Sequence, residues 1–159
     1  MNYHRHTIFL FAITLVLLIA PTSFNQLFAQ GNTGKTTSEL LIGTWTLEYN
    51  TSKDKMSAKA KAHYDKMDTK RKDRLEKAYK GRKVTFGKDS SYLQQQADGR
   101  QVVGTWKLID GDQTVEVTNQ KGTVNRYKLE KLTSKKLVLN PEINGPAKMI
   151  MAEWHFIKN

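Results

Sequence analysis

The sequence predicts a mainly β fold, an eight-stranded antiparallel up-and-down barrel with one long basic helical insertion after its first strand. Three observations lead to it. Short segments of alternating apolar residues succeed one another from residue 83 onward, separated by turn residues. One similar segment stands before them, at residues 41–49. Between them, at residues 53–83, lysine and arginine dominate the composition.

The first element in the chain is typical of a secretory signal peptide, at residues 1–29. It contains no acid, carries Arg5 near its start and continues with an apolar run from Ile8 to Ala20. That run is short for a permanent transmembrane helix, which needs about 20 apolar residues. The small residue Ala29 then offers a cleavage site. We therefore expect an exported protein, periplasmic or secreted, with an uncleaved membrane anchor as the alternative.

Composition limits the chemistry available to the mature chain. The chain has no cysteine, which excludes disulfides, a thiolate zinc site and a cysteine nucleophile. Cleavage would leave 159 − 29 = 130 residues with 25 bases and 15 acids, a net charge of +10. That length suffices for one domain with a single core. Residues 30–38 are polar and predicted to form a flexible leader, with the barrel domain after it at 39–158.

The first strand is predicted at residues 41–49 because its apolar residues alternate. Its inward face carries Leu41, Gly43, Trp45, Leu47 and Tyr49. Gly43 leaves room for a large neighbour, and we expect the indole of Trp45 to fill it.

The insertion, at about residues 52–81, is predicted to be a long helix. Residues 53–83 hold 13 bases and 5 acids, a net charge of +8. Apolar side chains recur at near-helical spacing, Gly81 is a suitable stop, and a break is expected near Asp68–Thr69. The apolar stripe is thin, so the helix needs the rest of the protein to hold it. It consists of Met56, Ala60, Tyr64, Met67, Leu75 and Ala78.

The remaining strands are expected to pair as sequential hairpins. With the first strand they make eight, enough to close a barrel with a narrow interior and to remove exposed sheet edges. They are predicted at residues 83–86, 92–96, 102–109, 114–118, 124–132, 136–139 and 150–157.

Residues 40–158 resemble the bacterial lipocalin-like domains, small calycin-type barrels of exported proteins. The opening Leu41-Ile-Gly43-Thr-Trp45 is similar to that family's first-strand motif, and Gly104-Thr-Trp106 repeats part of it. The hairpin with Phe86, Asp89 and Tyr92 also fits, as does the later run Tyr127-Lys-Leu129, Leu132 and Leu137-Val-Leu139. The resemblance implies an eight-stranded barrel with an internal pocket and no catalytic residues. The chain departs from the pattern in having Ser90-Ser91 after Asp89, and Lys158 where lipocalins often stack an arginine on the first-strand tryptophan.

A small apolar or amphipathic molecule inside the barrel is the expected ligand, because such pockets are lined by aromatic and aliphatic side chains. The alternative is that the same side chains simply fill a narrow barrel. Gln94, Gln96 and Arg126 are candidates for a polar contact. The candidate ligand-binding residues are Trp45, Leu47, Tyr49, Phe86, Tyr92, Trp106, Leu108, Tyr127 and Trp154, with Leu129 and Phe156 also expected to point inward.

Catalysis, a metal and a cofactor are not expected. His63 and His155 are the only histidines after the signal peptide, and neither belongs to a ligand motif. Asp110 and Asp112 flank Gly111 as turn residues do, and Ser90-Ser91 lacks the context of a nucleophile elbow. We expect a monomer that is not an enzyme.

The basic helix supports a second hypothesis. Lys70, Arg71, Lys72 and Arg74 could bind an anionic surface or a protein partner, with an affinity that falls as salt rises. The aromatics of this helix are few, so specific nucleic-acid binding is not expected. The alternatives are a solvated face that keeps the protein soluble, or a lid over the barrel mouth.

Overall fold

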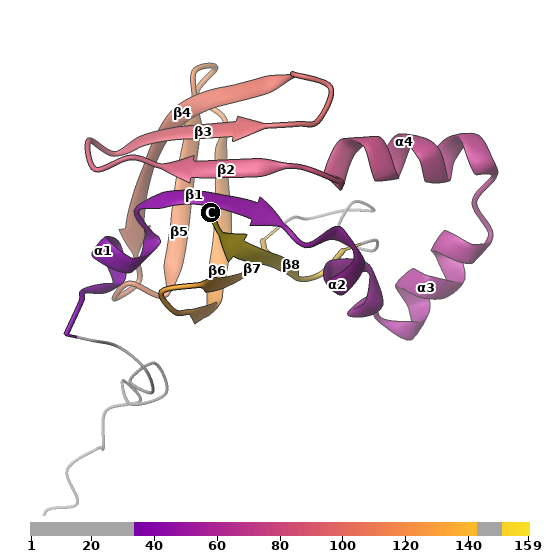
Figure 1. The fold of residues 1–159 in the computed structure, drawn as a ribbon, viewed down its shortest axis with the longest axis horizontal. Helices are drawn as coiled ribbons and strands as arrows, with labels where there is room; N and C mark the ends of the chain where they lie inside the picture. Colours follow the sequence, from indigo (N-terminus) through magenta and orange to yellow (C-terminus); the bar gives the residue numbers. More distant parts are fainter. Residues whose placement is uncertain (1–33, 143–150) are drawn as a thin grey trace, which may run out of the picture.

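The computed structural model describes residues 34–142 and 151–159, in which eight antiparallel strands close into a barrel in sequence order (Figure 1). The predicted signal peptide lies outside the described residues. The strands are β1 (Gly43–Leu47), β2 (Lys83–Phe86), β3 (Ser91–Gln95), β4 (Gln101–Ile109), β5 (Thr114–Asn119), β6 (Val124–Leu132), β7 (Lys136–Pro141) and β8 (Trp154–Lys158).

Closure depends on β1, which pairs with β2 on one side and with β8 on the other. Trp45 lies opposite Val84 in β2 and opposite Lys158 in β8. The predicted up-and-down barrel is therefore confirmed. Its three tryptophans, Trp45, Trp106 and Trp154, belong to a single buried core cluster, as the alternation of the strands predicts.

One end of the barrel is closed by the short helix α1 (Thr37–Leu41). A capping box starts the helix, because Thr36 Oγ1 accepts from Glu39 N while Thr36 N donates to the Glu39 carboxylate. Leu40 and Leu41 are buried in the core. The prediction of a flexible leader is thus wrong for residues 36–38, which form the cap and first turn of α1.

The same end holds a lysine stacked on a tryptophan. Lys158 Nζ lies 4.8 Å from the Trp45 ring centroid and donates to the Leu40 carbonyl at 2.8 Å. Trp45 Nε1 donates to the Leu41 carbonyl at 2.7 Å. A Cβ on Gly43 would lie 2.8 Å from Lys158 Cε. Gly43 therefore makes room for Lys158, and the prediction that Trp45 fills this space is wrong.

The insertion is three short helices rather than one long helix. They are α2 (Tyr49–Asp54), α3 (Ala58–Asp65) and α4 (Thr69–Tyr79). Ser57 caps α3 by accepting from Ala60 N, and Asp68 caps α4 by accepting from Arg71 N at 2.8 Å. The expected break near Asp68–Thr69 and the stop at Gly81, which has φ +74°, are confirmed. We call residues 49–80 the arm.

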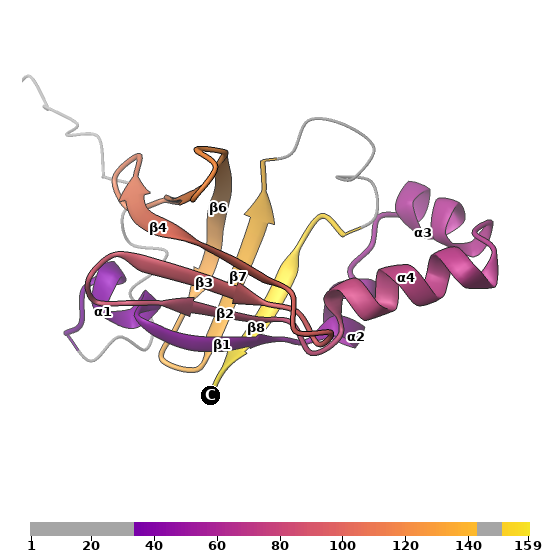
Figure 2. The ribbon, with the colours of Figure 1, turned by 90° about the horizontal axis from the view of Figure 1, so that it is seen from above.

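The arm leaves the barrel at the end opposite α1, and both views show α3 and α4 projecting from it (Figures 1 and 2). Helix α2 anchors it, because Ser52 Oγ donates to the Glu48 carbonyl and accepts from His155 N at 3.0 Å. Beyond α2, Ala60 is the one buried residue among the helical residues of α3 and α4. None of the described helices combines the length and apolar character that a membrane crossing requires.

The first and last strands are shorter than predicted. The first strand is shorter than residues 41–49, because Leu41 ends α1 and Tyr49 begins α2. The last strand begins at Trp154, and Met151 is buried before it without belonging to a strand. Ile150, the predicted first residue of that strand, lies outside the described residues.

Candidate functional site

Aromatic side chains in the barrel interior form two groups. The first lies around Phe86, whose ring centroid is 5.5 Å from that of Tyr92 and 5.5 Å from that of Trp106. Trp106 Nε1 donates to the Gly87 carbonyl at 2.9 Å. The indole N–H of this group is therefore satisfied within the barrel wall, which fits a structural role.

The second group lies at the end of the barrel from which the arm projects. It centres on Trp154, the first residue of β8. The Trp154 ring centroid is 5.9 Å from that of Tyr79, 5.5 Å from that of Tyr127 and 6.5 Å from that of Phe156. This group brings together a residue of the arm, Tyr79, with residues of two strands that are neither adjacent in sequence nor paired with each other.

A buried arginine accompanies this second group. Arg82 immediately precedes β2 and has the same phase as the inward residues Val84 and Phe86. It is only 6% exposed. Its guanidinium carbon lies 4.3 Å from the Tyr79 ring centroid and 5.0 Å from that of Trp154. The cation is thus held among aromatic rings inside the barrel end.

The environment compensates this charge only in part. Arg82 Nε and Nη2 donate to one oxygen, the Ala78 carbonyl, at 3.3 and 3.0 Å. Burying an ion costs several kcal/mol, whereas cation–π contacts return only about 0.5–2 kcal/mol. Burial accordingly lowers the pKa of Arg82, with nearby tyrosines opposing the shift.

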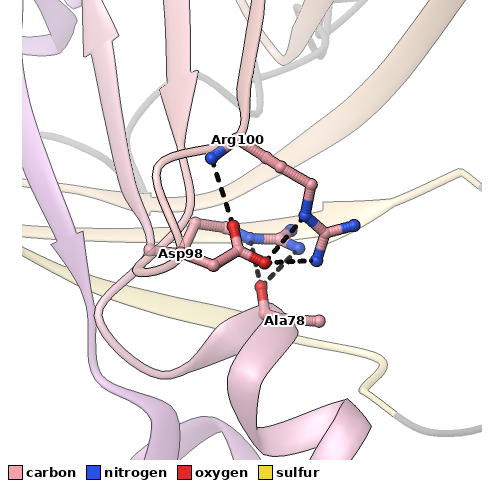
Figure 3. A network of polar contacts seen from close by, with 4 residues as sticks. Ala78, Asp98 and Arg100 are labelled. Atoms are coloured by element: carbon pink, nitrogen blue, oxygen red, sulfur yellow. Dashed lines mark hydrogen bonds and ion pairs between the residues drawn. The ribbon is translucent and has the colours of Figure 1, made fainter.

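The hairpin between β3 and β4 supplies no free acid to Arg82. The acid of this hairpin is Asp98, and its Oδ2 lies 2.7 Å from Arg100 Nη2. The pair lies beside the end of α4 that carries Ala78 (Figure 3). Among the described residues, no carboxylate oxygen lies within 4.0 Å of an Arg82 nitrogen. Arg82 is therefore a buried cation without an anionic side-chain partner in that part of the chain.

Three buried polar atoms among the described residues lack a hydrogen-bond partner: Trp154 Nε1, Gln96 Oε1 and Tyr49 Oη. Buried polar groups normally have partners, so each such atom needs an explanation. All three belong to residues at the arm end of the barrel, because Gln96 follows β3, Tyr49 begins α2 and Trp154 begins β8. Of these atoms, Trp154 Nε1 belongs to the ring over which the Arg82 guanidinium lies.

The predicted ligand-binding residues all contribute to one core, at different levels along the barrel. Trp45, Leu47, Phe86, Tyr92, Trp106 and Trp154 are buried on strands, as are Leu129 and Phe156. Leu108 and Tyr127 are half-buried against the same core, and Tyr49 is buried on α2 rather than on the first strand. Leu47, Tyr49, Tyr127 and Trp154 lie at the arm end, where Leu47 N donates to the Arg82 carbonyl, whereas Trp45 lies against α1.

The predicted polar contacts have separate outcomes. Gln94 Oε1 accepts from the Tyr92 hydroxyl at 3.4 Å, and Gln96 presents a buried oxygen. The prediction for Arg126 is wrong: its side chain is exposed and its Nε binds Glu116 at 2.9 Å. Glu116 alternates with the inward Val115 and Val117 and so lies on the outer wall, where Lys107 also contacts it.

Sequence reasoning missed Arg82 and Tyr79. The net charge of residues 53–83 predicts one exposed group of bases, so it does not identify Arg82, which immediately precedes β2, as an inward residue. The available signal is the period of two, since Arg82 shares its phase with Val84 and Phe86. No comparable signal exists for Tyr79, which reaches the core from the last turn of α4.

The predicted anion-binding residues lie on α4, which has no buried residue. Lys70, Arg71 and Arg74 are exposed, whereas Lys72 is half-buried. Arg71 pairs with Asp68 at 3.4 Å, and Lys72 Nζ donates to the Asp65 carbonyl while lying 5.4 Å from the Tyr64 ring. Two of the four bases therefore serve the arm itself.

Open hollows occur on the outside of the described residues. One, of about 420 Å³, lies between the end of α4 and the β3–β4 hairpin. It is lined by Asp73, Glu76, Lys77, Lys80, Gly81 and Ala97. Others of about 420 and 570 Å³ lie beside Tyr49 and beside Lys158. Within residues 34–142 and 151–159, no group of three or more acids or histidines is placed to hold a metal ion.

Comparison with known proteins does not assign this chain to a family. No family model matches the sequence, and no curated protein matches it. One solved structure, a DUF4847 family protein from Bacteroides vulgatus, is similar to 75% of this chain over 93% of its own length. The identity is 18% and the TM-score 0.43. This likeness is too distant to assign the chain to a family.

Proposed function

We propose that this protein is an exported, monomeric, non-catalytic lipocalin-like protein that binds a small apolar or amphipathic molecule in the arm end of its barrel. One observation carries the proposal: the buried, incompletely compensated Arg82 cation lies against the aromatic rings of Tyr79 and Trp154, and Trp154 Nε1 has no partner among the described residues. Filled structural cores rarely leave such groups unsatisfied. Ligand sites, by contrast, combine apolar walls with a few polar atoms.

The stacking of Lys158 on Trp45 also supports a lipocalin-like assignment. The cation sits at the position where that resemblance calls for an arginine. Its ammonium closes the barrel floor through the Leu40 carbonyl, at the end away from the proposed site. Because α1 closes the floor, a ligand would enter the barrel from the arm end.

The proposal is tested by titrating the purified protein with fatty acids and apolar dyes while following tryptophan fluorescence. Saturable one-site quenching is expected in the wild type and in Trp106→Phe, because Trp106 lies in the other aromatic group. Trp154→Phe is expected to lose most of the quenching, because its ring lies at the site. Absence of saturable binding for every probe would contradict the proposal.

The alternative function, binding of an anionic surface through α4, has one observation in its favour. The helix projects from the barrel with no buried residue, and Lys70 and Arg74 are exposed. Binding to anionic vesicles should then fall in Lys70→Gln/Arg74→Gln and decrease with salt. The matched control is Lys128→Gln/Lys131→Gln, which removes the same charge from the exposed face of β6. Equal loss in both variants would indicate a response to net charge alone.

A further inference from the structure

We propose that Arg82 binds the anionic group of the barrel's ligand, so that the ligand is an anionic amphiphile whose apolar body lies against the aromatic group around Trp154. This inference rests on the proposed function and specifies its ligand class. It derives from three features of the arm end: the charge balance of Arg82, the free donors near it, and the apolar surface beyond it.

The charge balance concerns every acid in the chain. Residues 1–33 and 143–150 contain no aspartate or glutamate, so all 15 acidic side chains belong to described residues. None of them pairs with Arg82, although Asp98 and Glu116 each pair with other bases. No acidic side chain therefore neutralises the Arg82 cation, which leaves the negative charge to come from a bound molecule.

Among the described residues, Arg82 and Trp154 carry the donors that lack acceptors near the aromatic group around Trp154. A guanidinium carries five N–H groups, and two of its nitrogens donate to the Ala78 carbonyl. Trp154 Nε1, on the ring over which the guanidinium lies, is buried and has no partner among the described residues. Donors without acceptors suit a group that only accepts, as a carboxylate or a phosphate does.

The surface beyond the cation is apolar. Trp154 contacts Tyr127 and Phe156, and buried aliphatic side chains lie beside it, since Leu139 is opposite Trp154 and Leu129 is opposite Leu139. The hydroxyls of Tyr92 and Tyr127 are neutral at physiological pH, because burial raises the pKa of both. They add no negative charge that would repel an anion. A head group at Arg82 thus continues into a surface suited to an alkyl or aryl body.

The test compares head groups on one alkyl chain, using dodecanoate, dodecyl phosphate, dodecanol and dodecyltrimethylammonium below their micelle concentrations. Calorimetry on the wild type is expected to show one or both anions binding about tenfold to a hundredfold more tightly than dodecanol, the range expected for a charge-assisted hydrogen bond. The cation should bind more weakly than dodecanol. The ratio of the two anions tells a carboxylate ligand from a phosphate ligand.

Variants locate the effect. Arg82→Gln should reduce anion affinity about tenfold or more while changing dodecanol affinity less than about twofold, the difference again arising from one charge-assisted contact. Arg100→Gln is the matched control, because it removes a neighbouring but exposed charge, and it should leave both affinities unchanged. If Arg82→Gln does not fold, the head-group series in the wild type still decides.

The outcomes separate the two proposals. Equal binding of dodecanol and of both anions by the wild type would overturn the role of Arg82 and leave a neutral-ligand barrel. Unchanged anion affinity in a folded Arg82→Gln variant would overturn it as well. Binding of none of the four probes would instead contradict the proposed function itself.

Discussion

The barrel and the arm are built from elements of similar length but differ in the contacts that hold them. Every strand pairs with two neighbours, and residues of all eight strands meet in one core. Helices α3 and α4 bury one alanine between them and carry exposed charges over most of their surface. Burial therefore makes the barrel the stable unit, whereas caps and local contacts maintain the outer arm. Changes that separate these two sources of stability test this difference.

The largest effect is expected from Trp45→Ala, which removes a fully buried indole from the barrel floor. Deletion of such a side chain leaves a cavity and should lower the free energy of unfolding by about 3–5 kcal/mol. Urea unfolding followed by fluorescence and circular dichroism measures it. The matched change in the arm is Tyr64→Ala, which should cost less than about 1 kcal/mol because Tyr64 is only half-buried. Equal losses would show that the arm is part of the cooperative core.

A smaller and local effect is expected from Asp68→Ala, which removes the N-cap of α4. Loss of a cap costs about 1 kcal/mol, so the amides of α4 should exchange about fivefold faster with solvent. Hydrogen exchange read by NMR measures this change. Asp68→Asn keeps a capping oxygen and serves as the control. Faster exchange in the barrel strands as well would contradict an arm that opens independently.

The smallest effect concerns Glu116 on the outer wall of the barrel. Hydrogen bonds from Lys107 and then Arg126 hold its pKa below the usual value. The stabilisation is therefore present above the unfolded-state pKa of about 4.3, and it is lost as pH falls through the lower folded-state pKa. Glu116→Gln should thus lower the free energy of unfolding at pH 7 more than at pH 3. The difference should vanish in a Lys107→Met/Arg126→Met background, and its persistence there would assign it to another cause.

Much of the barrel could be predicted from the sequence, because each strand carries a local pattern. Alternating residues such as those of β2 and β4, separated by glycine-containing turns, indicate both the strands and their inward faces. The inward positions of Trp45, Trp106 and Trp154 agree with the same period. The helical breaks are harder to place, because Ser57 interrupts an apolar stripe that continues across it, and only its capping bond shows the boundary.

The barrel floor and the candidate site both depend on contacts between distant segments. Lys158 reaches Trp45 and Leu40 across the whole chain, and no local pattern indicates the contact with Leu40. Arg82 is hidden by the charge of its neighbours, although its phase in β2 is readable. The absence of a carboxylate partner for Arg82 cannot be predicted from the sequence, because it depends on where the acidic side chains lie in three dimensions.

The seam between β1 and β8 has a consequence for the order of folding. It joins segments separated by more than a hundred positions, as the bond from Thr46 Oγ1 to Asn159 Oδ1 illustrates. Contacts of such long range form slowly, since closing the long intervening loop costs conformational entropy before the contact forms. Until then both seam strands present open edges that a second chain can join. Refolding at high protein concentration should therefore yield dimers in which two chains exchange strands at this seam. Because the chains are strongly cationic and repel one another, the yield of these dimers should rise with salt concentration.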